Sequence, residues 1–200
     1  MGMLFTDRLV DAFAAARRLH ATHVRKGTGT PYLTHLMAVA ALVAEYGGDE
    51  DQVVAALLHD AVEDQGGRKT LESIRDEFGE TVAFYVESCS ESDTQPKPPW
   101  RERKEAFLSR LAEAGPEVRL ICAADKLHNA RSMSRDLRTA GNALWQRFNG
   151  GRDGTLWYMQ EALNTLAEGW SHPILAELAH ALASLRKAAS GPEATAAGDS

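Results

Sequence analysis

Apolar residues recur every three to four positions along most of the chain, which is the spacing of an amphipathic helix. In residues 6–22, Leu9, Phe13, Ala16 and His20 fall on one stripe, with a threonine placed to cap the helix. The same criteria predict helices over 35–46, 50–64, 70–78, 80–90, 102–114, 117–137, 155–170 and 173–189. Alternating patterns long enough for strands are absent, so the sequence predicts an all-α fold of roughly eight to ten helices.

Three stretches interrupt the helical pattern. Residues 25–32 form a basic, glycine-rich loop, 91–100 a proline-rich loop, and 148–154 a glycine-rich turn. No internal repeat or composition shift marks a second domain. We therefore expect one domain over residues 1–188, followed by a small, polar and disordered tail over 189–200.

Composition narrows the function classes. The chain is 44% hydrophobic and 25% charged, and no run approaches the roughly 18–20 apolar residues of a membrane helix. Its net charge of -6 argues against a nucleic-acid surface, although it leaves room for a small anion held in a local pocket. Cys89 and Cys122 lie in apolar stretches without metal-knuckle spacing, which favours free thiols and a reducing cytoplasm. The lack of a long apolar run leads us to expect no membrane partner.

Four ionisable residues end the apolar run of residues 53–58. On one continuous helix, His59, Asp60, Glu63 and Asp64 occupy a single arc of roughly 140°. Every other face of that segment is apolar, so these groups face inward or into a cleft.

Burial of three carboxylates requires a cation. An unpaired buried carboxylate costs several kcal/mol, and the segment itself contains no lysine or arginine. A divalent metal would supply the charge and would also use the imidazole. The alternative is a helix end that emerges into solvent before Gly66, which is most plausible for Asp64, and the spacing alone leaves both readings open.

Three segments read together resemble a known family. "HVRKGTGTPYLTH", "AALLHDAVED" and "AADKLHNARS" occur in this order. Together they resemble the HD-domain metal-dependent phosphohydrolases, and within them the hydrolase domain of RelA/SpoT-type alarmone enzymes, most of all the free-standing small alarmone hydrolases of the metazoan SpoT homologue type. The resemblance covers about residues 5–170 and implies the HD-domain helical fold.

The resemblance also implies a metal site. Matched position by position, the metal ligands would be His35, His59, Asp60 and Asp125. A mixed imidazole and carboxylate set suits Mn²⁺, Fe²⁺ or Zn²⁺, and the family's use of manganese makes Mn²⁺ the expected cofactor.

Further matched positions imply the reacting and binding groups. Glu63 and Asp64 match the family's catalytic acidic pair, which would hold the attacking water and move its proton. The expected substrate contacts are Arg25, Lys26, Tyr32, Asn129 and Ser132. His128 is interpreted as a structural residue.

The expected function is therefore a metal-dependent hydrolase that removes the 3′-pyrophosphate from guanosine tetra- or pentaphosphate. GDP or GTP and pyrophosphate would be its products, and a small guanosine polyphosphate rather than a nucleic acid its partner. One alternative is an HD-family phosphohydrolase for another nucleotide, such as a nucleoside monophosphate, a dNTP or NADPH. The other is a catalytically silent nucleotide-binding HD domain.

Overall fold

The computed structural model describes residues 5–92 and 96–190, and they confirm an all-α fold. The helices are α1 (Asp7–Leu19), α2 (Leu33–Glu45), α3 (Glu50–Leu58), α4 (Ala61–Asp64), α5 (Arg68–Phe78), α6 (Glu80–Cys89), α7 (Trp100–Ala112), α8 (Pro116–Ala140), α9 (Gly151–Ala167), α10 (Pro173–Ala189) and the 3-10 helix η1 (Gly141–Arg147). Within the same residues, extended pairing is limited to one antiparallel bridge between Val24 and Pro31.

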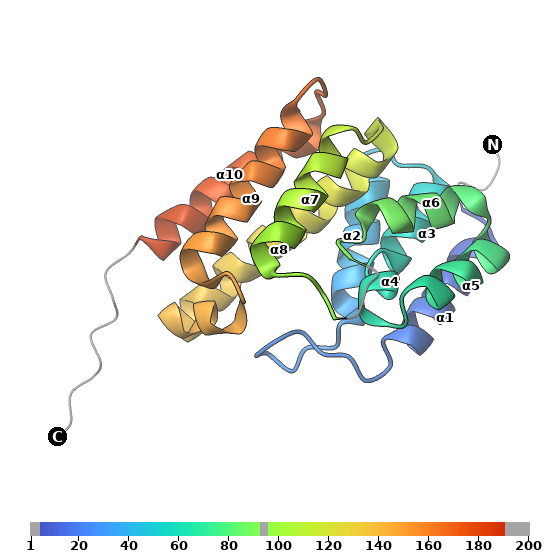
Figure 1. Cartoon of the computed structure of the whole chain (residues 1–200), viewed down its shortest axis with the longest axis horizontal. Coiled ribbons are helices and arrows are strands. Elements are labelled where there is room, and N and C mark those ends of the chain that lie inside the picture. The colour runs from blue at the N-terminus through green and yellow to red at the C-terminus, as the bar shows by residue number, and fades with distance from the viewer. Residues whose placement is uncertain (1–4, 93–95, 191–200) are drawn as a thin grey trace.

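The long helix α8 joins the two sides of the molecule. Helices α1 to α6 gather on one side, and α7, α9 and α10 lie together on the other (Figure 1). Helix α8 packs against α2, α3 and α6 on the first side and against α9 and α10 on the second. Its first half is buried all round, so a polar side chain on it faces protein or a cavity rather than bulk water.

Local signals explain where several helices begin. Asp49 and Gln52 form a capping box at the start of α3, and the hydroxyl oxygen of Thr6 accepts a hydrogen bond from the Arg8 N–H. Helices α8 and α10 both begin with a proline, where the missing N–H has no helical partner to lose.

The single helix predicted over 50–64 is wrong at its centre, because the chain breaks between α3 and α4 at His59 and Asp60. The His59 Nδ1 atom lies 2.8 Å from the carbonyl oxygen of Ala56. In a continuous helix that oxygen would accept the Asp60 N–H. The imidazole therefore competes with the backbone at this point, and Asp60 is left with ψ near -1°.

The glycine-rich stretch 148–154 is a helix start more than a turn. Helix α9 begins at Gly151, four residues earlier than predicted, and η1 precedes it without any signal in the hydrophobic pattern. The indole of Trp100 lies so close to Gly150 that an added Cβ would approach it to 2.6 Å. A side chain at this position would therefore displace the start of α7.

Two further expectations concern membrane-spanning helices and the C-terminal tail. None of the helices in the described parts of the chain has the length and apolar character needed to cross a bilayer. Helix α10 continues to Ala189, and the tail predicted from 189 onward lies, for residues 191–200, outside the described residues.

Candidate metal centre

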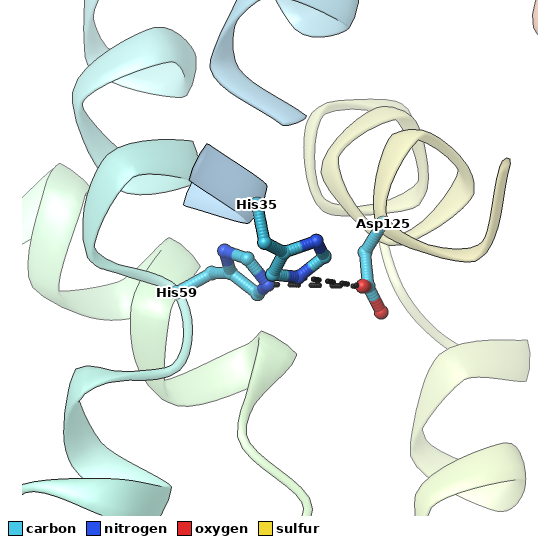
Figure 2. A group of neighbouring side chains, drawn as sticks. All are labelled: His35, His59 and Asp125. Atoms are coloured by element: carbon cyan, nitrogen blue, oxygen red, sulfur yellow. Dashed lines mark ion pairs between the residues drawn. The ribbon is translucent and has the colours of Figure 1, made fainter. Parts of the chain in front are cut away.

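Three side chains from separate helices converge at the centre of the molecule. His35 comes from α2, His59 follows α3, and Asp125 lies midway along α8, and all three point toward one another (Figure 2). The Asp125 Oδ1 atom lies 3.3 Å from His35 Nε2 and 3.9 Å from His59 Nε2. All three residues are buried, and their donor atoms lie within 4.8 Å of one another, which is close enough to share one cation.

Asp60 adds a second carboxylate to this group. Its Oδ2 atom lies 3.1 Å from His59 Nε2 and 3.5 Å from His35 Nε2. The same oxygen accepts a hydrogen bond of 2.6 Å from the Tyr32 hydroxyl, which fixes the orientation of the carboxylate. The four residues that the sequence suggested as ligands are thus brought together.

Both imidazoles use Nδ1 for protein contacts and direct Nε2 at the carboxylates. His59 Nδ1 is bound to the Ala56 carbonyl, and His35 Nδ1 lies 2.7 Å from Nδ1 of His128. His59 Nε2 is buried and, within residues 5–92 and 96–190, makes no hydrogen bond of good geometry, although Asp60 Oδ2 lies 3.1 Å away. Because Nδ1 of His59 donates its proton to the Ala56 carbonyl, Nε2 faces the carboxylate oxygens favourably only with a second proton or a metal ion between them. Metal-binding histidines are typically oriented in this way by a contact at the other ring nitrogen.

The charges around the two histidines also favour a bound cation. Burial alone would lower the pKa of His59, but the carboxylates of Asp60 and Asp125 outweigh it and raise that pKa to about 9. Burial alone would raise the pKa of Asp125, yet the ammonium of Lys126 and the hydrogen bond with His35 hold it well below its usual range. The carboxylates are therefore ionised, and the field that holds a proton on His59 also suits a divalent cation. The donor set fits such an ion.

Both oxygens of Asp125 also accept hydrogen bonds from neighbouring polar side chains. Lys126 Nζ lies 2.7 Å from Asp125 Oδ2, and Asn129 donates from Nδ2 to Oδ1 at 2.6 Å. Asn129 in turn accepts a hydrogen bond of 2.9 Å from the guanidinium of Arg25. The loop that carries Arg25 is thereby connected to the centre, although it precedes Asn129 by 104 residues.

Glu63 and Asp64 lie beside the centre in different environments. Glu63 Oε1 accepts from Lys97 Nζ at 2.9 Å and from Arg103 Nη1 at 3.0 Å. The protein itself therefore supplies cations for Glu63, and they come from outside the segment 53–65. Asp64 lies 3.9 Å from Lys97 Nζ and 4.0 Å from His23 Nδ1. Burial, together with the charges of Asp60 and Glu63, raises the pKa of Asp64 to about 6.

These groups open into one cavity of about 340 Å³. Its walls include nearly all the residues suggested by the sequence: Arg25, Lys26, Tyr32, His59, Asp60, Glu63, Asp64, Asp125, Asn129 and Ser132. His35 lies beneath the wall and is only 1% exposed. Ser132 reaches the cavity and also lies 3.5 Å, through its Oγ atom, from Nε2 of His128. The structural interpretation of His128 agrees with this position between Ser132 and His35.

The cavity has a basic side that was not predicted: Arg103 and Lys104 line its wall, and Lys97 is joined to it through an ion pair with Glu63. Lys97 and Arg103 come from the proline-rich loop and from α7, and Lys104 ion-pairs with Glu91. The Tyr158 hydroxyl donates to the same Glu91 Oε1 at 2.9 Å. The only sequence signal was the concentration of lysine and arginine between residues 97 and 104, which an exposed helix would also show.

Comparison with known proteins identifies a family model and several relatives that this chain resembles. A family model described as HD domain matches residues 12–156. The guanosine-3′,5′-bis(diphosphate) 3′-pyrophosphohydrolase MESH1 of Homo sapiens is 37% identical over 131 residues, covering 64% of this chain and 70% of that protein. A probable GTP pyrophosphokinase of Mycobacterium leprae is 40% identical over 124 residues, which cover 61% of this chain but only 15% of that longer protein.

A solved structure shares the fold. A metazoan ortholog of SpoT, described as hydrolysing ppGpp and acting in starvation responses, superposes with a TM-score of 0.73 at 24% sequence identity. The match covers 89% of this chain and 95% of the other. The helical arrangement of Figure 1 is therefore that of a known fold in almost its whole extent.

Proposed function

The chain belongs to the HD domain family, and on that basis we propose that it is a metal-dependent hydrolase that removes the 3′-pyrophosphate from guanosine tetra- or pentaphosphate. The observation that carries the proposal is the buried convergence of His35, His59 and Asp125, with Asp60 close to both imidazoles, beside the acidic pair Glu63 and Asp64. The chain's match to 70% of the human pyrophosphohydrolase supports the choice of substrate.

The proposed metal ligands are His35, His59, Asp60 and Asp125, and the proposed ion is Mn²⁺. Two imidazoles and two carboxylates are a donor set that first-row divalent metals accept, and geometry alone does not select among these metals. Bound in this site, such an ion would lower the pKa of a coordinated water and polarise the phosphoryl group.

The acidic pair would manage the attacking water. Asp64, with its raised pKa, is suited to accept the proton that the water loses as it attacks the phosphorus next to the ribose 3′-oxygen. Glu63, held by Lys97 and Arg103, would orient that water. Arg103, which lines the cavity, would offset the negative charge of the departing pyrophosphate.

The nucleoside end of the substrate would lie toward the loop after α1. A guanidinium can stack on a purine or bind phosphate, and Arg25 is already oriented by its hydrogen bond to Asn129. Lys26, Tyr32 and Ser132 line the same cavity and would complete the contacts. The two free thiols support a reducing compartment, and we propose the cytoplasm.

A metal-supplemented assay with product identification tests this function. The purified protein, loaded with Mn²⁺, is incubated separately with guanosine tetraphosphate, a dNTP, a nucleoside monophosphate and NADPH. Pyrophosphate and GDP from the tetraphosphate are the expected products. Orthophosphate released from another nucleotide, with the tetraphosphate left intact, would replace the proposed substrate, and binding without turnover of any of them would indicate a silent nucleotide-binding domain.

The Glu63→Gln variant supplies the matched control. It keeps the size of the side chain and removes the charge of a group that contacts no proposed metal ligand in the structure. We expect it to retain Mn²⁺ and to lose turnover. Unchanged turnover would contradict the role proposed for the acidic pair.

A further inference from the structure

The two cysteines of the chain meet at the wall of the central cavity. Cys89 ends α6 and Cys122 lies on α8, and their Sγ atoms are 3.6 Å apart with no bond between them. Both residues line the cavity that holds the candidate metal centre. Because the chain has only these two cysteines, neither has another internal partner.

The position of Cys122 connects the pair to the metal centre. It lies three residues before Asp125 on the same helix, within one helical turn. Lys126, which contacts Asp125 at 2.7 Å, also acts electrostatically on the Cys122 sulfur. A change in the position of α8 at Cys122 would therefore be transmitted to Asp125.

The surroundings make one thiol the natural nucleophile. The hydrogen bond with Cys89 lowers the pKa of Cys122 below its usual value, and the ammonium of Lys126 acts in the same direction, whereas burial and the Asp125 carboxylate oppose both. A hydrogen-bonded thiol next to an ammonium group is a typical setting for a reactive cysteine. The second thiol stands within reach to resolve an oxidised intermediate.

We propose that Cys89 and Cys122 form an oxidation site, at which hydrogen peroxide converts the pair into an intramolecular disulfide that weakens the binding of a divalent metal at the neighbouring centre. The Cys122 thiolate attacks one peroxide oxygen, the O–O bond breaks, and the hydroxide that leaves takes up a proton to form water. The Cys89 thiol then attacks the resulting sulfenic sulfur and releases a second water. In total, two thiols lose two electrons and two protons to one peroxide.

The physical consequence follows from the geometry of a disulfide. The sulfurs must approach from 3.6 Å to about 2.05 Å, with a Cβ–S–S–Cβ dihedral near 90°. Rotation of the two side chains covers part of that approach, and we expect the remainder to draw the end of α6 toward α8 beside the metal centre. Displacement of groups that orient metal ligands typically lowers metal affinity by about 10- to 100-fold, and we expect a change near the lower end.

The test measures the thiols and the metal separately in the full chain. After treatment with hydrogen peroxide and quenching, we expect the free thiols under denaturing conditions to fall from two to none. Non-reducing peptide mapping should give a cross-linked peptide that contains both cysteines and is lighter by two hydrogens than its reduced parts. Titration calorimetry with Mn²⁺ should show about tenfold weaker binding, restored by dithiothreitol.

The Cys89→Ser and Cys122→Ser variants are the controls. Each variant keeps one thiol and cannot form the intramolecular disulfide. Peroxide should therefore leave its Mn²⁺ affinity unchanged. That result would exclude oxidation of the histidines as the cause of weaker binding. Two thiols that survive peroxide, or disulfides found only between molecules, would overturn the oxidation site. A disulfide without a change in affinity would overturn its coupling to the centre. Reduced protein that binds no Mn²⁺ would count instead against the proposed function.

Discussion

The Nδ1 atom of His128 lies 2.7 Å from the Nδ1 atom of His35, so one imidazole must donate a proton to the other. Burial, followed by the neighbouring His35 and Arg25, lowers the pKa of His128 to about 4. His128 is therefore neutral near pH 7 and can accept the Nδ1 proton of His35. This assignment places the Nδ1 proton of His35 between the two rings and leaves Nε2 as the atom that faces Asp60 and Asp125.

Removal of His128 should therefore weaken the metal centre without removing a ligand. We expect His128→Phe to lower the affinity for Mn²⁺ by about 10- to 100-fold, the usual effect of losing a group that orients a metal-binding histidine. Titration calorimetry of the metal-free protein measures the effect. His180→Phe, at an exposed position on α10, is the control and should bind as the original chain does. Equal affinities in both variants would contradict this role of His128.

The contact of Lys97 with Glu63 predicts an effect on turnover rather than on the metal. In the Lys97→Met variant, Glu63 loses one of the two cations that hold its carboxylate, while Arg103 stays in place. We expect kcat for the proposed pyrophosphate release to fall by up to about 10²-fold, because Glu63 then positions the attacking water less firmly. Lys69→Met, on the exposed face of α5, should have no such effect. A fall in Mn²⁺ affinity with kcat intact would assign Lys97 to the metal centre instead.

These contacts mark the boundary of what the sequence could predict. Hydrophobic spacing located nearly every long helix, because burial of one face imposes a period that a sequence displays directly. The ion pair between Lys97 and Glu63 joins residues 34 positions apart and leaves no period. The hydrogen bond between His35 and His128 joins residues 93 apart. The break at His59 was also missed, because a side-chain contact with Ala56 produces it and helix propensity does not record such a contact.

Three of the four candidate ligands, His59, Asp60 and Asp125, also carry a signal of their own in the sequence, whereas His35 was predicted from the family resemblance alone. Each of the apolar runs before His59 and before Asp125 leads directly into ionisable groups, and the structure buries both runs. An apolar run that ends in a carboxylate indicates a buried charge and so a nearby cation. That signal cannot identify the cation, and the protein supplies Lys126 to Asp125 as well as a place for a metal ion.

The raised pKa of Asp64 predicts how stability changes with pH. Its pKa is about 6 in the folded protein against 3.8 for the ordinary group, because burial and the charges of Asp60 and Glu63 disfavour the ionised form. As the pH rises from about 4 to about 6, the unfolded chain loses this proton first, so the folded state loses stability over that window. Above about pH 6, Asp64 is ionised in the folded protein as well, and this charge lowers the free energy of unfolding.

Asp64→Asn removes that cost and should stabilise the metal-free protein. We expect a higher melting temperature than for the original chain at pH 7.5, measured by calorimetry in the presence of a chelator, and a smaller difference at pH 4.5. The same variant should lose turnover by about 10²- to 10⁴-fold, because the proposed proton acceptor is gone. A melting difference that is independent of pH would show that the titration of Asp64 is not its source.

The contact between Trp100 and Gly150 predicts a stability effect of steric origin. Gly150 has φ of -83°, which alanine adopts without strain, so substitution tests the steric contact alone. An added Cβ would lie 2.6 Å from the indole ring, and overpacking of this kind typically costs about 1–3 kcal/mol. Gly154 lies inside α9 at a looser 3.2 Å, and the gain in helix propensity of up to about 1 kcal/mol should offset its contact.

A double-mutant cycle separates the contact from other effects of the substitution. Gly150→Ala should be clearly destabilising in chemical denaturation, and Gly154→Ala close to neutral. In the Trp100→Ala background the indole is absent, so Gly150→Ala should then cost almost nothing, even though Trp100→Ala is itself destabilising. Because α7 begins at Trp100, three residues after Lys97, the single Gly150→Ala variant should also lower kcat through the displaced loop. If Gly150→Ala lowers the free energy of unfolding equally in both backgrounds, the glycine is needed for the start of α9 and not for packing of the indole.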